Sequence, residues 1–225
     1  MIEALIFDFD GLIIDSELPD YEVWQEIYRA HGCDLAFDDW AQGIGSMDTF
    51  DPYSHLEAQL GRPIDRAAVR ADRQRRYHEM VVRQPILPGV EAYLADARRL
   101  GLKLAVASSS SRSWVAGHLA RLGLDRYFDC LACGDEVART KPDPAVYQAA
   151  LRGLGTPPAR AIALEDSPNG VLAAKAAGMR CVVVPNPLTR LLPFEGADLR
   201  LQSLADLPLT HLLSLLNSRP HRLRD

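Results

Sequence analysis

Two aspartates, Asp8 and Asp10, directly follow a short apolar segment near the start of the chain and are separated by one residue. The segment 4–7 has the pattern of a buried strand in a parallel sheet, which Gly11 would end. Because side chains alternate along an extended chain, both carboxylates should point to the same side. Neighbouring carboxylates repel each other unless a cation lies between them, and hard oxygen ligands suit Mg²⁺. The alternative for an isolated Asp-x-Asp is a solvated strand end or turn.

Three other segments carry reactive groups at or beside the predicted ends of strands. They are the run 108–111, which consists of serines, the pair Glu165 and Asp166, and Lys141 in a loop. Taken singly, the serines could cap a helix, the acidic pair could favour a helix N-terminus, and the lysine could lie on the surface. In a parallel sheet, however, all these loops emerge at one edge, so the groups can converge although the chain separates them.

Together these groups suit phosphoryl transfer. One carboxylate can act as the nucleophile and a second can protonate the leaving oxygen and later activate water. A hydroxyl and backbone N–H groups can hold the phosphate oxygens, and a lysine can neutralise their charge. Further acidic residues can hold Mg²⁺.

The elements that would position these groups alternate between strand and helix. The predicted strands cover 4–7, 103–107, the residues around Cys130, 161–164 and 181–184. The predicted helices of this part cover 90–100, 114–122, 145–154, 170–177 and 204–216. Such alternation predicts an α/β fold with a Rossmann-like parallel sheet and helices on both faces.

The segment after Gly11 differs, because about 70 residues show no convincing strand. A helix should begin after Asp15-Ser16-Glu17, with an apolar stripe that includes Trp24 and Tyr28, and further helices are predicted over 40–45, 52–60 and 66–82. We therefore expect a core domain of residues 1–14 and 86–225, and an inserted helical cap domain of residues 15–85.

Composition excludes several classes of protein. The chain has 225 residues, of which 48% are hydrophobic and 24% charged, and its formal net charge of -5 does not favour nucleic acid as a partner. No apolar run approaches the roughly 20 residues that span a membrane, and no secretory signal is present. Four scattered cysteines fit a reducing cytoplasm. Cys130 and Cys133 lie in a predicted strand, where small buried residues are expected rather than a redox or zinc site.

Four segments in order resemble the motifs of the haloacid dehalogenase-like hydrolases. They are Asp-Phe-Asp-Gly-Leu-Ile-Ile-Asp-Ser-Glu at 8–17, Val-Ala-Ser-Ser-Ser at 106–110, Lys-Pro-Asp-Pro-x-x-Tyr at 141–147, and the segment 165–179, which begins Glu-Asp-Ser. The resemblance covers almost the whole chain. The insertion after the first motif is similar to the small helical cap of the β-phosphoglucomutase and phosphoglycolate phosphatase subgroup.

The resemblance implies a role for each matching residue. Asp8 would be the nucleophile and Asp10 the general acid and base. Ser108 and the backbone amide of Ser109 would bind the phosphoryl group, while Lys141 would neutralise charge and orient Asp8.

The resemblance also implies the Mg²⁺ ligands. These would be Asp8, the backbone carbonyl of Asp10, and Asp166, with Glu165 in or near the same shell. The expected partner is then a small phosphorylated metabolite, such as a sugar phosphate, bound by a monomer or weak homodimer with no nucleic acid and no membrane.

Two features favour a phosphatase over a β-phosphoglucomutase-type mutase, which is the alternative. Asp20 stands where that mutase has a histidine, and the cap loop 43–50 contains no basic residue to hold a second phosphate. The arginines of the segment 70–76 could contact an anionic substrate, but they are expected on a solvated face. A third reading, a non-enzymatic phosphoacceptor like a response-regulator receiver, fits poorly because the receiver's acceptor lies on a mid-chain strand.

Overall fold

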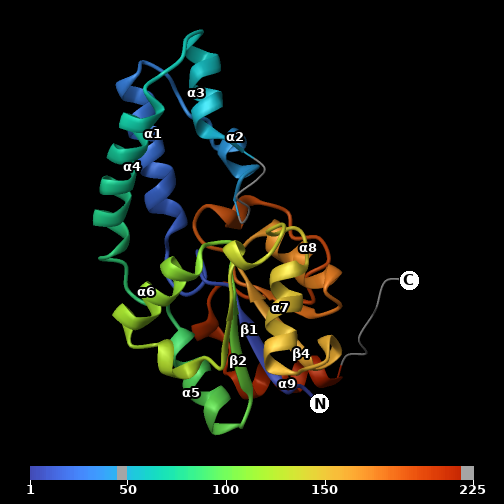
Figure 1. The fold of residues 1–225 in the computed structure, drawn as a ribbon. Coiled ribbons are helices and arrows are strands. Elements are labelled where there is room, and N and C mark those ends of the chain that lie inside the picture. The colour runs from blue at the N-terminus through green and yellow to red at the C-terminus, as the bar shows by residue number, and fades with distance from the viewer. Residues whose placement is uncertain (45–49, 219–225) are drawn as a thin grey trace.

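A computed structural model describes residues 1–44 and 50–218 of the chain. Its centre is a parallel sheet of six strands in the order β3-β2-β1-β4-β5-β6 (Figure 1). The strands are β1 (Ala4–Phe7), β2 (Lys103–Ala107), β3 (Cys130–Ala132), β4 (Ala161–Glu165), β5 (Arg180–Val183) and β6 (Leu199–Arg200). The predicted α/β architecture is confirmed, and the strand order reverses direction beside β1, where such folds place their ligand sites.

Helices cover both faces of this sheet. One face packs on α5 (Val90–Arg99), α6 (Arg112–Leu122) and α9 (Leu209–Ser218), and the other packs on α7 (Ala145–Leu154) and α8 (Pro168–Ala176). The strand β1 therefore lies between two apolar layers and carries no polar side chain over its length.

The period of two in β1 divides its side chains between the layers. Leu5 and Phe7 join the cluster under α5, α6 and α9, while Ala4 and Ile6 join the cluster under α7 and α8. All four are completely buried. This burial fixes the register of β1, because a slip of one residue would exchange the two layers.

A second group of helices, here called the helical lobe, lies beyond the end of the sheet (Figure 1). It consists of α1 (Glu17–Ala30), α2 (Phe37–Ala41), α3 (Pro52–Leu60) and α4 (Arg66–Val81). Trp24, Tyr28 and Leu56 form its own apolar cluster, to which Leu188 from the sheet-bearing part also belongs. The lobe thus has an independent core but also packs against the loops of the sheet.

Some predicted boundaries were wrong. The helix expected over 40–45 is instead α2, which ends at Ala41, and residue 45 of that segment lies outside the described residues. The last helix begins at Leu209 rather than at Leu204, because Pro208 favours a helix start just after it. The two-residue strand β6 was not predicted, since it is too short to show alternation. In the part of the chain that the structure describes, no helix is both long and apolar enough to span a bilayer.

Candidate active site

The loops after β1, β2 and β4 bring their polar residues together at one edge of the sheet. Asp8 follows β1 directly, and its backbone N–H donates to the Leu164 carbonyl at 2.9 Å, so the parallel pairing extends to the functional residue. The Asp8 side chain is buried. Burial raises the pKa of Asp8 to about 7, because the opposing attraction of Lys141 only partly offsets it.

Lys141 lies between two carboxylates in the interior. Its Nζ donates to Asp8 Oδ1 and to Glu165 Oε1, at 2.7 Å in both cases. Burial alone would lower the pKa of Lys141, but the charges of Asp8 and Glu165 outweigh burial and the pKa lies above its usual value. The lysine is therefore a fixed cation, and it holds the Oδ1 of Asp8 while leaving Oδ2 outside this contact.

Glu165 is enclosed by donors. In addition to Lys141, Tyr147 donates its hydroxyl to Oε1 at 2.7 Å, and the other oxygen accepts from the backbone N–H of Asp166 and from the N–H and hydroxyl of Ser167. Gly170 makes this arrangement sterically possible, since a Cβ there would lie 1.9 Å from the Glu165 carboxylate. Glu165 is thus held as an anchor for Lys141.

Asp166 presents its carboxylate beside Asp8. Asn186 donates to Asp166 Oδ2 at 2.7 Å, and a Cβ at Gly11 would lie 2.1 Å from the same oxygen, so the positive φ of +79° and the missing side chain at Gly11 both serve this approach. Burial and then the charges of Asp8 and Glu165 raise the pKa of Asp166 well above its usual range.

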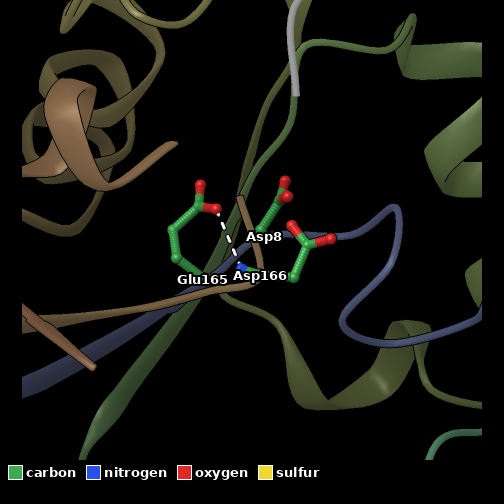
Figure 2. A group of neighbouring side chains, drawn as sticks. All are labelled: Asp8, Glu165 and Asp166. Carbon is green, nitrogen blue, oxygen red and sulfur yellow. Dashed lines mark hydrogen bonds between the residues drawn. The ribbon is translucent and has the colours of Figure 1, made fainter. Parts of the chain in front are cut away.

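Three of these acidic groups form a compact cluster. Figure 2 shows Asp8, Glu165 and Asp166 gathered at the ends of β1 and β4, each offering an oxygen within 4.8 Å of the others. Burial, and after it the repulsion between these carboxylates, raises the pKa values of Asp8 and Asp166. A hard oxygen donor set of this kind fits Mg²⁺. Asp8 and Asp166 are the better placed ligands, because the oxygens of Glu165 already accept hydrogen bonds.

Asp10 points toward the helical lobe and accepts several hydrogen bonds. Its Oδ1 accepts from the Ser16 hydroxyl at 2.7 Å and from the Trp114 indole N–H at 3.0 Å. Its Oδ2 accepts from the hydroxyls of Ser110 at 2.6 Å and Ser108 at 3.4 Å. The second aspartate of the motif is therefore oriented by residues from three separate segments.

Two of these donors link Asp10 to the helical lobe. Ser16 stands at the N-terminus of α1 but makes no capping hydrogen bond, and the Asp15 carboxylate instead accepts from the N–H of Leu18. The Trp114 ring stacks on Tyr77 of α4, with centroids 5.4 Å apart and the planes inclined by 13°. The position of the lobe therefore bears on the orientation of Asp10.

The serines of the run 108–111 make different contacts and have different roles. Ser108 is buried, and its Oγ accepts the N–H of Ser110. Ser111 caps α6 by accepting the N–H of Trp114. The capping role and the site role that the sequence allowed as alternatives are thus both present, at different serines.

A cavity of about 890 Å³ lies between the strand ends and the helical lobe. Its lining includes Asp8, Asp10, Ser108, Ser109 and Lys141, so these predicted site residues face one space.

One expectation about the lobe was wrong. Arg73 is not on a solvated face but lines the cavity, where it forms a bidentate ion pair with Asp20. By contrast, Arg75 pairs with the exposed Glu79. Of the two cysteines that were expected to be buried, Cys133 is buried and Cys130 is half-buried.

Several residues of the site were not identified from the sequence. They are Ser16, Ser110, Trp114, Tyr147 and Asn186. Ser16, Ser110 and Tyr147 lie inside the quoted motifs, which is the signal that could have identified them. Trp114 had the pattern of an apolar helix residue, and nothing in the sequence connects Asn186 with Asp166.

Known proteins are similar to this chain over most of its length. A family model described as haloacid dehalogenase-like hydrolase matches residues 2–178. YhcW of Bacillus subtilis is 46% identical, covering 97% of this chain and 100% of its own. Hexitol phosphatase B of Escherichia coli is 33% identical, covering 94% and 97%.

Solved structures are also similar to this chain over most of its length. CbbY from Rhodobacter sphaeroides in complex with xylulose-(1,5)-bisphosphate superposes with a TM-score of 0.76 at 33% identity, covering 94% of this chain and 99% of its own. β-Phosphoglucomutase from Clostridium difficile gives 0.77 at 26% identity, covering 96% and 98%. The expected resemblance is confirmed. Membership of a family of hydrolases contradicts the third interpretation, a non-enzymatic receiver module. The chain belongs to the haloacid dehalogenase-like hydrolases.

Proposed function

We propose that this protein is a Mg²⁺-dependent phosphatase that hydrolyses a small phosphorylated metabolite, a sugar phosphate or similar ester, through an aspartyl-phosphate on Asp8. The observation that supports this most strongly is the convergence of Asp8, Asp10, Ser108 and Lys141 on one cavity. Each supplies one function that phosphoryl transfer needs. The names of hexitol phosphatase B and of the CbbY complex point to the same class of substrate.

In the first half-reaction, Asp8 Oδ2 attacks phosphorus and the bond between phosphorus and the ester oxygen breaks. Lys141 keeps Oδ1 in place and balances its charge at 2.7 Å. Asp10, in its acid form, gives its proton to the departing alkoxide, so the alcohol leaves neutral. The Ser108 hydroxyl and the Ser109 amide are assigned to the oxygens of the phosphoryl group.

In the second half-reaction, Asp10 takes a proton from water, which attacks the phosphorus of the aspartyl-phosphate. The bond to Asp8 breaks, inorganic phosphate is released, and the protonated Asp10 is ready for the next ester. The net reaction is phosphomonoester plus water giving alcohol plus phosphate. Four donors, namely the hydroxyls of Ser16, Ser108 and Ser110 and the indole N–H of Trp114, hold the Asp10 carboxyl within the cavity.

Mg²⁺ would be held by Asp8, by Asp166 and by the backbone carbonyl of Asp10. Glu165 would complete the acidic cluster and bind Lys141. When bound, the ion would neutralise charge between Asp8 and the phosphoryl oxygens. We further assign residues 15–85 as the cap domain and residues 1–14 with 86–225 as the core domain, in a cytoplasmic protein that is a monomer or weak homodimer.

The experiment is phosphate release from a panel of sugar phosphates, polyol phosphates and phosphoglycolate, with Mg²⁺ and with a chelator. Asp8→Asn should remove turnover while circular dichroism stays unchanged, because an amide cannot form the acyl phosphate. Asp72→Asn, a charge-matched change on the outer surface of α4, should keep the rate. Full turnover by Asp8→Asn would refute the nucleophile.

The same panel separates the mutase alternative, which the likeness to β-phosphoglucomutase raises. The protein is incubated with β-glucose 1-phosphate and glucose 1,6-bisphosphate, and the formation of glucose 6-phosphate is measured together with the release of free phosphate. Isomerisation without net phosphate release would replace the phosphatase by a mutase.

A further inference from the structure

The wall of the cavity that the helical lobe contributes is poor in available positive charge. Of the described residues that line the cavity, one is a lysine, Lys141, one is an arginine, Arg73, and one is a histidine, His78. Lys141 is already committed to Asp8 and Glu165. Arg73 is the lining arginine, and so the side chain with the geometry to clasp a second phosphate on the far side of the substrate.

Arg73 is also already paired, because two nitrogens of its guanidinium donate to the two carboxylate oxygens of Asp20. Its Nε donates to Asp20 Oδ1 at 2.9 Å and its Nη2 to Asp20 Oδ2 at 2.5 Å. The guanidinium also lies over the Tyr77 ring, 4.8 Å from the centroid. A planar bidentate pair of this kind satisfies the geometry by which arginine otherwise clasps a phosphate.

The remaining charges on this wall are negative. Besides Asp20, the acidic residues Asp10, Glu17 and Asp51 line the cavity. Residues 45–49, which lie outside the described part, have the sequence Gly-Ser-Met-Asp-Thr and so contribute no basic side chain. A second phosphate at this end would face carboxylates without a counter-ion, and like charges brought together cost several kcal/mol.

The rest of the wall suits a neutral, hydroxylated group. Trp24, Tyr53, Tyr77 and Trp114 line the cavity with aromatic rings. The carboxylates that repel phosphate accept hydrogen bonds from hydroxyl groups. Apolar surface combined with a few polar groups is the usual composition of a pocket for a small ligand.

We propose that the Asp20–Arg73 pair makes this enzyme selective for esters that carry a single phosphate on an otherwise uncharged polyol or sugar, and excludes bisphosphates. The pair neutralises the one lobe arginine that could receive a second phosphate. This inference rests on the proposed phosphatase activity and adds its substrate class.

The test compares esters that differ only in the second phosphate. Phosphate release from fructose 1-phosphate, fructose 6-phosphate and fructose 1,6-bisphosphate is measured with Mg²⁺, and kcat/KM for the bisphosphate is divided by that for the better monophosphate. We expect the wild-type ratio to be about 0.1 or lower. Asp20→Asn removes the charge that binds Arg73 while keeping the shape, so the ratio should rise about tenfold or more.

Asp72→Asn is the matched control. It removes the same charge from the same lobe, but Asp72 pairs with Arg75 and Arg76 away from the cavity, so the ratio should stay at the wild-type value. A wild-type enzyme that hydrolyses the bisphosphate as well as the monophosphates would overturn the inference, and that comparison stands even if Asp20→Asn does not fold.

Two other results would also overturn it: an unchanged ratio in folded Asp20→Asn, or an equal rise in Asp72→Asn. The absence of phosphate release from every ester of the panel would instead refute the underlying phosphatase activity.

Discussion

Replacing Lys141 by methionine should destabilise the protein strongly, because it leaves two buried carboxylates without their cation. Asp8 and Glu165 are 5% and 0% exposed, and each lies 2.7 Å from Lys141 Nζ. Removing one partner of a buried ion pair typically costs about 3–5 kcal/mol. For a chain of this length, that loss lowers the melting temperature by roughly 6–20 °C, at about 2–4 °C per kcal/mol.

Lys175→Met is the matched control, because Lys175 forms an ion pair of the same 2.7 Å length with Asp198. Both of those side chains are 26% exposed. An ion pair so open to solvent is worth about 0.2–1 kcal/mol. Urea unfolding of the two variants, followed by far-ultraviolet circular dichroism in chelator, therefore isolates the effect of burial.

The pH dependence gives the reasoning a second test. The pKa of Lys141 is raised in the folded state, so the protonation of Lys141 itself favours folding fully below the unfolded pKa of 10.5 and does not change between pH 5.5 and 8. The pH dependence in this range therefore comes from its partner Asp8. The pKa of Asp8 is raised to about 7 against 3.8 when unfolded. The folded protein therefore binds an extra proton as pH falls, and the destabilisation in Lys141→Met should shrink from pH 8 to pH 5.5.

A double variant completes the argument. Glu165→Gln removes one of the two stranded charges yet keeps an oxygen for the Tyr147 hydroxyl, so Lys141→Met with Glu165→Gln should recover part of the lost stability. If Lys141→Met loses no more stability than Lys175→Met, or if its loss does not change with pH, then the buried charges do not govern this site.

Two further predictions concern the orientation of Asp10 and the binding of Mg²⁺ by Asp8. Trp114→Phe keeps the ring that stacks on Tyr77 but removes the N–H that donates to Asp10, so kcat should fall about tenfold with little change in KM, measured by steady-state kinetics; an unchanged kcat would show that Trp114 does not position Asp10. Mg²⁺ should bind about tenfold more weakly at pH 6 than at pH 8 by calorimetry, because Asp8 with a pKa of about 7 must release its proton to bind the ion. A pH-independent affinity would remove Asp8 from the ligand set.

The sheet could be predicted because each strand fits its place locally. The apolar run 4–7 is short, buried on both sides and followed by polar residues, and such a run leaves few alternatives to a central parallel strand. The edge strand β6 has no such pattern, since two residues cannot show a period, and its existence depends on the pairing of Val182 with Leu199. Central elements therefore follow from the sequence, and marginal elements follow from their neighbours.

The convergence of the proposed catalytic groups could be predicted for a related reason. Topology alone sends the ends of parallel strands to one edge, so Asp8, Ser108 and Asp166 need no contact information to be placed together. The residues that hold them differ, because Trp114 and Asn186 reach the site only through the packing of α6 and of the loop after β5. Their side chains satisfy hydrogen bonds that no spacing in the sequence specifies.

Arg73 shows where this limit matters for function. As one arginine in a charged helix it fits a solvated face, and Asp20 on α1 gives no local reason to think otherwise, since 53 positions separate the two residues. Only the packing of α1 against α4 aligns the two side chains over the cavity, where their ion pair changes the charge that a substrate meets. In the function that we propose, the reaction type thus depends on local motifs at strand ends, whereas the choice of substrate depends on a long-range pair between two helices.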